Sequence, residues 1–269
     1  MPVLDLKRPI ANNGQVVNQP PRVNYPSSDN MGESGLQFFV CNLLLIPLLR
    51  SYFSEYEQRV LVGGNQNFYY EQGQPQRYIA PDAYVIQDEV TPLEDVKSWK
   101  LWEHGGKGPA LAVEVVSDEY DKDYSPELLR VYERLGVREL IRYDPLSTSH
   151  PRVTKHGPRR LLTHFVRDDA GRLVEQPLPR PGLVRSAVFG FWLVHQPTRS
   201  LRLALGPRGT PLWPTEAERA AAESERAAAE SERATIAEAT IERLQQELAR
   251  LRGEPSEPAP APTDPDAPT

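Results

Sequence analysis

A single cysteine, Cys41, occurs among the 269 residues of this chain. One cysteine excludes an intramolecular disulfide and fits a reducing compartment, so we expect a cytoplasmic protein. Because Cys41 lies in an apolar run, we expect a buried and inert thiol rather than a nucleophile.

The chain also has no long uninterrupted hydrophobic run. Its most apolar segment, residues 38–49, spans 12 residues and contains Asn42 and Pro47. This segment is predicted to be too short and too interrupted to cross a bilayer, and the first ten residues do not resemble a signal peptide. The sequence therefore predicts a soluble protein without a membrane partner.

Three common catalytic patterns are missing as well. No glycine-rich phosphate loop opens a helix, no Gly-x-Ser-x-Gly elbow occurs, and the five histidines lack the spacing of metal ligands. These absences argue against a phosphate-loop nucleotidase, a serine hydrolase of the elbow type and a histidine-based metal site.

Acidic charge is concentrated near the C-terminus. The formal net charge is −6, yet residues 215–269 alone hold 13 acidic and 6 basic residues. This segment accounts for −7, so the other 214 residues carry +1. Because the acidity belongs to the tail, it does not exclude a basic face on the core that contacts nucleic acid.

Composition divides the chain into four parts. Residues 1–32 are rich in Asn, Pro, Gln and Ser and are expected to form a flexible arm. Residues 33–213 hold most of the aromatic and aliphatic residues and are predicted to form one domain. Residues 214–252 contain a seven-residue segment repeated without change and then apolar residues at 3, 4, 3 spacing, which predicts a helical coiled coil. Residues 253–269 hold six prolines and are expected to be disordered.

Helical and strand-like segments alternate within the expected domain. The apolar pattern of residues 36–53 predicts a mostly buried helix that Pro47 bends or divides. Residues 59–62 predict a short strand, and two apolar segments around a turn-rich centre predict a hairpin over residues 67–80. Toward the end of the domain, residues 151–206 predict short strands that either extend the same sheet or form a small β cap.

The centre of this domain contains its most strand-like segment. Residues 110–116 are rich in valine and apolar on both faces except at Glu114, which predicts a buried strand. Ser125 and Gly136 are expected to begin and end a helix, and residues 140–143 to form the next strand. The order predicts an α/β (α+β) fold in which helices flank a mixed β-sheet.

Two carboxylates occur where the surrounding residues are apolar. Asp82 follows Pro81 just before a strand-like segment, and Glu114 lies inside the strand predicted over residues 110–116. An ionised carboxylate is costly in such surroundings unless it is paired or bound to a metal. Adjacent strands lie about 5 Å apart, so both side chains are expected within reach of one Mg²⁺ ion, which prefers oxygen ligands.

A lysine follows these acids closely. Lys122 lies in the segment Asp121-Lys122-Asp123, shortly after Glu114. Beside a bound cation, it would stabilise the negative charge that develops on a phosphate during hydrolysis. Each of the three residues also has a structural explanation. Asp82 suits a turn, Glu114 an ion pair or an exposed edge, and Lys122 a surface lysine paired with its neighbouring aspartates.

Several motifs match a known family in their order and spacing. They are Ala80–Val85 with its Pro-Asp pair, Leu111–Ser117 with its Glu-Val-Val-Ser core, Tyr132–Leu140, and Tyr143–Pro145. Through these motifs the chain resembles the Uma2 family of restriction-endonuclease-like proteins, in the PD-(D/E)XK nuclease superfamily. The resemblance covers roughly residues 36–250 and includes the Ala/Glu/Arg-rich tail.

The resemblance implies a restriction-endonuclease-like fold and an endonuclease that hydrolyses DNA phosphodiester bonds with Mg²⁺ (or Mn²⁺). It assigns Asp82 and Glu114 as the metal-binding acids and the Val115 carbonyl as a third ligand. DNA is the partner that it implies. Glu33, just before the first expected helix, is a further candidate carboxylate.

The catalytic lysine of the family is absent from both of its usual positions. The position two residues after the acid holds Val116, and the position on the following helix, four residues before the tyrosine, holds Leu128. Lys122 is the remaining lysine near the acids. It is therefore the candidate third catalytic residue beside Asp82 and Glu114.

Two functions from different classes follow from these observations. In the first, the chain is a PD-(D/E)XK-type endonuclease, and its coiled coil forms a homodimer that presents two active sites to two DNA strands. In the second, it is a catalytically impaired nuclease fold that serves as a binding or assembly module through the coiled coil. The two carboxylates favour the first function, whereas the replaced lysines and the nearly neutral core favour the second.

Overall fold

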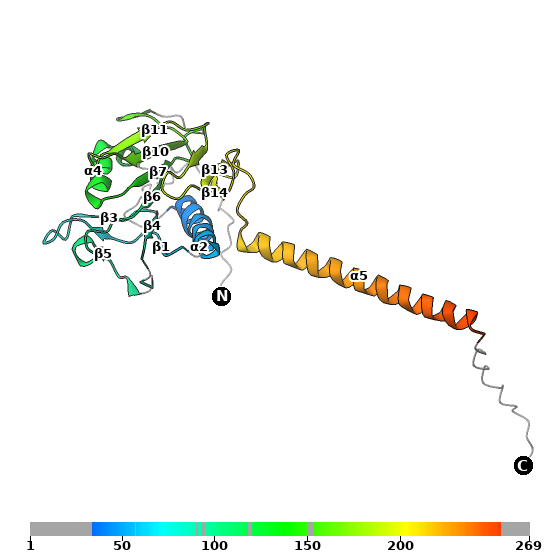
Figure 1. Cartoon of the computed structure of the whole chain (residues 1–269). Helices are drawn as coiled ribbons and strands as arrows, with labels where there is room; N and C mark the ends of the chain where they lie inside the picture. The colour runs from blue at the N-terminus through cyan, green and yellow to red at the C-terminus, as the bar shows by residue number, and fades with distance from the viewer. Residues whose placement is uncertain are drawn as a thin grey trace, which may run out of the picture.

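The computed structural model describes residues 34–253, except residues 57, 90, 93–94, 118–119 and 150–152. The expected N-terminal arm, residues 1–32, lies outside the described residues, and so do Glu33 and the expected proline-rich tail after residue 253. The described part consists of a helix-and-sheet domain and one long helix, α5 (Glu216–Leu251), which projects away from it (Figure 1).

A six-stranded mixed sheet forms the centre of the domain, in the order β1-β4-β6-β7-β10-β11. β6 and β7 are parallel, and the other neighbouring strands are antiparallel. The strands are β1 (Val60–Gly63), β4 (Ala83–Gln87), β6 (Leu111–Val115), β7 (Glu139–Tyr143), β10 (Leu162–Arg167) and β11 (Leu173–Gln176). This arrangement confirms the predicted mixed sheet.

One face of the sheet is covered by a continuous helical run. It contains α1 (Gly35–Phe38), the π-helical segment η2 (Phe39–Leu45) and α2 (Ile46–Glu55). Pro47 lies in the first turn of α2, directly after the π-helical segment. Proline is tolerated in a first turn because its missing N–H is not needed there, so the helix type changes beside Pro47 while the run itself stays continuous.

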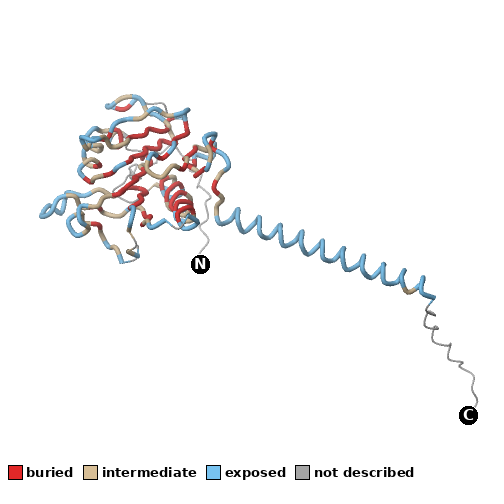
Figure 2. The backbone as a smooth tube through the Cα atoms, in the orientation of Figure 1, coloured by how far each residue is buried: buried red, intermediate tan, exposed pale blue. Residues whose placement is uncertain are grey.

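The run Gly35–Glu55 is 21 residues long with a mean hydropathy of 1.5, enough by length and composition to span a membrane. It extends the helix predicted over residues 36–53 by one residue at its start and two at its end, and it contains the apolar segment 38–49 with Asn42 and Pro47. Half of the apolar window is buried within the domain. Its buried residues belong to the main hydrophobic core, as in a helix that covers a sheet (Figure 2).

A second, three-stranded sheet packs beside the same helices. Its strands are β12 (Leu183–Arg185), β13 (Trp192–Gln196) and β14 (Ser200–Ala204). Figure 1 shows α2 between this sheet and strands β1 and β4. Both alternatives for residues 151–206 are therefore realised, since β10 and β11 extend the central sheet and β12–β14 form a separate one. A separate short pair, β8 (Val153–Thr154) and β9 (Gly157–Pro158), lies between β7 and β10 along the chain.

The opposite face of the central sheet is covered by α4 (Pro126–Leu135) and a small sheet. Ser125 caps α4 by accepting a hydrogen bond from Leu128 N, and Gly136 ends it with a φ of 79°. Both helix ends are therefore as predicted. The small sheet has the order β3-β2-β5 and contains the predicted hairpin. Its strands are β2 (Phe68–Tyr69), β3 (Tyr78–Ile79) and β5 (Trp99–Lys100), which leads into the 3₁₀ turn η4 (Leu101–Glu103).

Candidate active site

Asp82 and Glu114 come together where β4 begins and β6 ends. Ala83 and Val113 are antiparallel partners, and continuing this register by one residue sets Asp82 opposite Glu114. The N–H of Val115 donates to Oδ2 of the buried Asp82 at 2.7 Å. The structure thus places the two predicted acids on adjacent strands and fixes one of them by a backbone hydrogen bond.

The end of β1 holds the backbone of Asp82 in place. Asn65 N donates to the carbonyl of Pro81 at 2.8 Å. A Cβ atom at Gly64 would lie 2.3 Å from the carbonyl oxygen of Asp82, far closer than real contacts allow. Because only glycine permits this approach, Gly64 is required for the position of the first acid.

The Val115 carbonyl, predicted as a third ligand, lies beside the first helix. Gln37 Nε2 donates to it at 3.0 Å, and Gln37 Oε1 accepts from Ser34 N at 3.2 Å. Ser34 in turn caps the helix by accepting from Gln37 N. This capping box orients the Gln37 amide, so α1 is joined to the end of β6 at the candidate site.

Glu114 has a neighbour on α4 and another on β7. The hydroxyl of the fully buried Tyr132 donates a hydrogen bond to Glu114 Oε1. Arg142 is its partner across the parallel β6–β7 pair. Burial and the nearby carboxylates of Asp82 and Asp123 raise the pKa of Glu114 well above its usual range, while Arg142 and Lys122 act in the opposite direction. Glu114 therefore resists ionisation more than an exposed glutamate does.

Arg142 is a buried cation behind Glu114. Its guanidinium lies 4.7 Å from the ring centroid of Tyr124 and 5.3 Å from that of Phe165. Its Nε and Nη2 atoms have no hydrogen-bond partner among the described residues, and neither has Oγ1 of the neighbouring Thr163. The aromatic rings stabilise the charge, which then acts on Glu114 through a poorly solvated interior.

Lys122 lies on the short helix α3 (Tyr120–Asp123), the next helix along the chain after β6. Its side chain is exposed and lines the same cleft, of about 750 Å³, as the two acids. Asp123 is buried and accepts from Ser117 N at 2.8 Å and from Ser117 Oγ at 2.9 Å, which anchors α3 to the end of β6. The structure therefore brings Asp82, Glu114 and Lys122 into one cleft.

The donor set of this cleft fits a hard cation that keeps several waters. Across the described part of the chain, no three side chains of His, Cys, Asp or Glu group together as metal ligands. A metal here would rely on Asp82, Glu114, the Val115 carbonyl and water, which is a usual environment for Mg²⁺. Besides burial, repulsion from the Asp82 carboxylate raises the pKa of Glu114. A cation between the two carboxylates would remove that repulsion.

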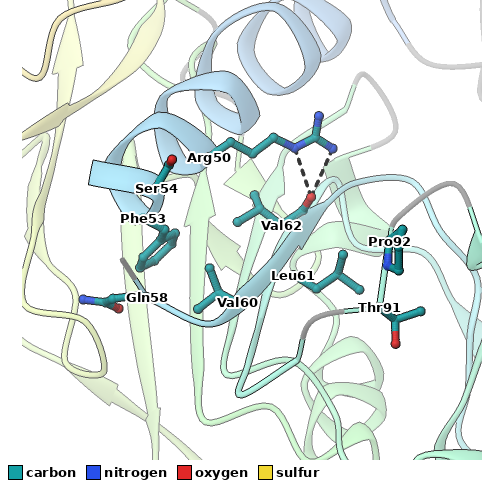
Figure 3. A pocket seen from close by; sticks show the side chains of 9 residues that line it. All are labelled: Arg50, Phe53, Ser54, Gln58, Val60, Leu61, Val62, Thr91 and Pro92. Atoms are coloured by element: carbon teal, nitrogen blue, oxygen red, sulfur yellow. Dashed lines mark hydrogen bonds between the residues drawn. The ribbon is translucent and has the colours of Figure 1, made fainter. Parts of the chain in front are cut away.

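A second cavity, of about 670 Å³, lies at the free edge of β1 and contains none of these residues (Figure 3). Arg50 reaches from α2 and donates through Nε and Nη2 to the carbonyl of Val62, at 3.2 and 3.1 Å. This contact satisfies an outward-facing carbonyl of the edge strand, a common protection against edge-to-edge pairing. We therefore assign this cavity a structural role.

A sequence model described as "Uma2: Putative restriction endonuclease" matches residues 31–194. The chain belongs to the Uma2 family. The match includes the candidate site of this Uma2 protein and ends within β13, so α5 lies outside it. No curated protein matches the chain. The mixed α/β fold is consistent with the restriction-endonuclease-like fold that the sequence predicts.

Four residues of this site were not predicted from the sequence. Gln37 was not considered, although it contacts the Val115 carbonyl. Tyr132 was named only within a family motif, although it contacts Glu114. A charged residue inside the apolar strand 139–143 was the available signal for Arg142. Asp123 was considered only as a partner of Lys122.

Val116 and Leu128 stand at the two positions where the resemblance implies a lysine, and the structure places both. Val116 is buried directly after β6. Leu128 lies in the first turns of α4 and lines the cleft that contains the two acids. The side chain at this helix position therefore reaches the cleft, which Leu128 lines with an apolar group.

Proposed function

We propose that this Uma2 protein is a Mg²⁺-dependent endonuclease that hydrolyses phosphodiester bonds of DNA. The observation that carries the proposal is the meeting of Asp82 and Glu114 on adjacent strands, in a cleft that Lys122 also lines. Membership of a restriction-endonuclease-like family supports a nuclease activity. Two carboxylates repel a phosphate unless a cation lies between them, which supports a metal-dependent reaction.

Each residue has a distinct role in this proposal. Asp82 and Glu114, with the Val115 carbonyl, would hold the divalent cation. Such an ion, when bound, polarises the scissile phosphate and lowers the pKa of a water molecule. The N–H of Val115 keeps Asp82 in one orientation, and Tyr132 does the same for Glu114.

Lys122 would act on the substrate rather than on the metal ligands. Its ammonium group would contact a phosphate oxygen and stabilise the negative charge that develops there. During hydrolysis a water molecule gives up a proton as its oxygen bonds to phosphorus, the bond from phosphorus to the leaving ester oxygen breaks, and that oxygen takes up a proton. The exposed side chain of Lys122 suits this role because it can move toward a bound strand.

A plasmid-cleavage assay in Mg²⁺ or Mn²⁺ tests the proposal. Wild type is expected to nick or linearise the plasmid, Glu114→Gln to be inactive, and Lys122→Met to be slowed by about 10²-fold or more, as for loss of one charge-stabilising group. Lys100→Met, on β5, is the matched control and should cleave like wild type. Equal cleavage by all four proteins would mean contamination or a wrong site. Loss in Glu114→Gln alone would keep the metal site and dismiss Lys122.

A second candidate function is a binding or assembly module that has lost catalysis. The observation that favours it is Leu128, which lines the cleft where many relatives carry the catalytic lysine. Calorimetric titration with Mn²⁺ separates the two functions. Binding that disappears in Asp82→Asn supports the endonuclease, whereas no binding, or binding unchanged in Asp82→Asn, supports the module.

A further inference from the structure

The long helix α5 leaves its apolar side chains uncovered. None of its 36 residues is buried, and Figure 2 shows the helix exposed along nearly its whole length. Its four large apolar residues after position 240 are all exposed: Ile241, Leu244, Leu248 and Leu251. A helix of this length extends about 54 Å, and nothing in the described part of the chain covers its distal half. Large apolar residues aligned on one side of an exposed helix mark an interaction surface.

These residues form a seam with coiled-coil spacing. Ile241 and Leu248 take the heptad position a, and Leu244 and Leu251 take position d. Continued toward the domain, the same pattern places Ala234 at a and Ala237 at d. The seam therefore runs over residues 234–251, which is two and a half heptads of apolar positions.

The pattern ends abruptly toward the domain. The next two d positions hold Glu230 and Glu223. Two parallel copies would bring each of these glutamates against its own counterpart, which is unfavourable in a coiled-coil core. Residues 216–233 would therefore stay apart as two separate helices, while residues 234–251 pair.

Charges beside the seam favour a parallel arrangement. In a parallel pair, each g position lies next to the e position of the following heptad in the other copy. Arg233 (g) then faces Glu238 (e) of the second copy, and Glu247 (g) faces Arg252 (e) of the second copy. Both contacts are attractive, and each occurs twice. The antiparallel alignment that stacks all four large apolar residues would instead place Glu247 beside Glu247 of the second copy.

The first turn of α5 is attached to the domain. Thr215 caps the helix, and Glu218 accepts from Arg202 Nη2 at 2.7 Å and from Nη1 at 3.1 Å. The guanidinium of Arg219 lies 4.9 Å from the ring centroid of Trp213. Because the domain directs the start of the helix, a contact at the distal end also constrains where a second domain lies.

We infer that residues 234–251 of α5 bind the same residues of a second copy of this chain as a parallel, in-register coiled coil. The dimer carries both domains at the same end, joined through two separate helical segments. This inference does not depend on the nuclease proposal, because it uses only the helix and its charges.

Sedimentation equilibrium of the full chain tests the partner. Wild type is expected to dimerise, and Leu244→Glu with Leu248→Glu to be monomeric with unchanged helix content by circular dichroism. Gln246→Glu, on the outer face of the same helix, is the matched control and should dimerise like wild type. A monomeric wild type, or a dimer that persists in the double variant, overturns the inference.

Disulfide trapping tests the orientation. Leu244→Cys is expected to form a covalent dimer on mild oxidation, because position d faces position d only in a parallel pair, whereas Gln246→Cys should not.

Charge reversal tests the same orientation. Arg233→Glu is expected to weaken dimerisation roughly threefold to tenfold, and adding Glu238→Arg to restore it. Equal trapping at both cysteines, or no rescue in the double variant, overturns the parallel arrangement.

Discussion

The hydroxyl of Tyr132 on α4 donates a hydrogen bond to Oε1 of Glu114 on β6. Tyr132 is fully buried, and Glu114 faces the cleft that contains Asp82 and Lys122. The contact joins α4 to Glu114, the second acid of the candidate metal site. Glu114 is therefore oriented by a residue that does not itself line the cleft.

Tyr132→Phe is expected to lower metal affinity and cleavage while the fold is retained. The substitution removes the donor to Glu114, which leaves the carboxylate free to rotate, and costs about 1 kcal/mol of stability as for a single hydrogen bond. Titration calorimetry with Mn²⁺ and the plasmid assay measure the effect. Tyr143→Phe is the matched control, because it removes another buried tyrosine hydroxyl, which contacts His195 at 2.8 Å. Equal losses of metal binding in both variants would contradict the role of Tyr132.

Glu114→Gln is expected to stabilise the metal-free protein at neutral pH. Because the pKa of Glu114 is raised in the folded state, the folded protein holds a proton that the unfolded chain releases. Between the ordinary pKa of a glutamate and the raised pKa of the folded state, the unfolded state therefore binds fewer protons. The free energy of unfolding falls as pH rises through this range. Thermal denaturation in EDTA measures the difference, at roughly 2–4 °C for each 1 kcal/mol in a chain of this size. The advantage of Glu114→Gln should shrink toward pH 4.

Added Mg²⁺ should reverse this order. Wild type gains stability from an ion that binds only the folded state, whereas the variant lacks a ligand and gains little. The melting temperature of wild type is then expected to rise with Mg²⁺ concentration until it exceeds that of Glu114→Gln. If Mg²⁺ raised both melting temperatures equally, the ion would bind elsewhere on the chain.

Gln37→Met is expected to destabilise the protein and weaken the site. Methionine keeps the volume of the side chain but removes the donor to the Val115 carbonyl, and an unsatisfied buried group costs about 1–3 kcal/mol. Urea denaturation gives the loss of stability, and Mn²⁺ titration the loss of affinity. Gln74→Met, at an exposed position of the β2–β3 turn, should leave both unchanged. Unaltered stability in Gln37→Met would mean that water replaces the amide.

Much of this fold follows from local patterns. The α4 helix was predictable at both ends, because the Ser125 cap and the Gly136 left-handed residue are short-range signals. The central strands β6 and β7 were predictable from apolar runs that suit a sheet covered on both faces. The bounds of the first helical run, Gly35–Glu55, are also close to the predicted 36–53, whereas the π-helical segment before Pro47 was not predicted.

The candidate site was predictable only in part. Asp82 and Glu114 could be found because carboxylates are unusual among apolar strand residues. Gln37, Tyr132 and Arg142 could not be assigned to the site, because their contacts depend on helix packing and on the β6–β7 register. Such long-range pairings are not encoded in the spacing of residues along one segment.

The start of α5 is expected to stay attached to the domain in mild acid. The hydrogen bonds from Arg202 and from Thr215 N lower the pKa of Glu218 to about 2. Because the folded pKa lies below the ordinary value for glutamate, the contact contributes fully above pH 4.5 and is lost as pH falls toward 2. Hydrogen exchange of the amides of residues 215–222 at pH 3.5 should therefore be slower in wild type than in Glu218→Gln. Glu216→Gln removes a charge from the same helical turn and should exchange like wild type. If wild type and Glu218→Gln already exchanged equally at pH 4.5, Arg202 would not hold Glu218 ionised, and the direction of α5 would not be fixed by this pair.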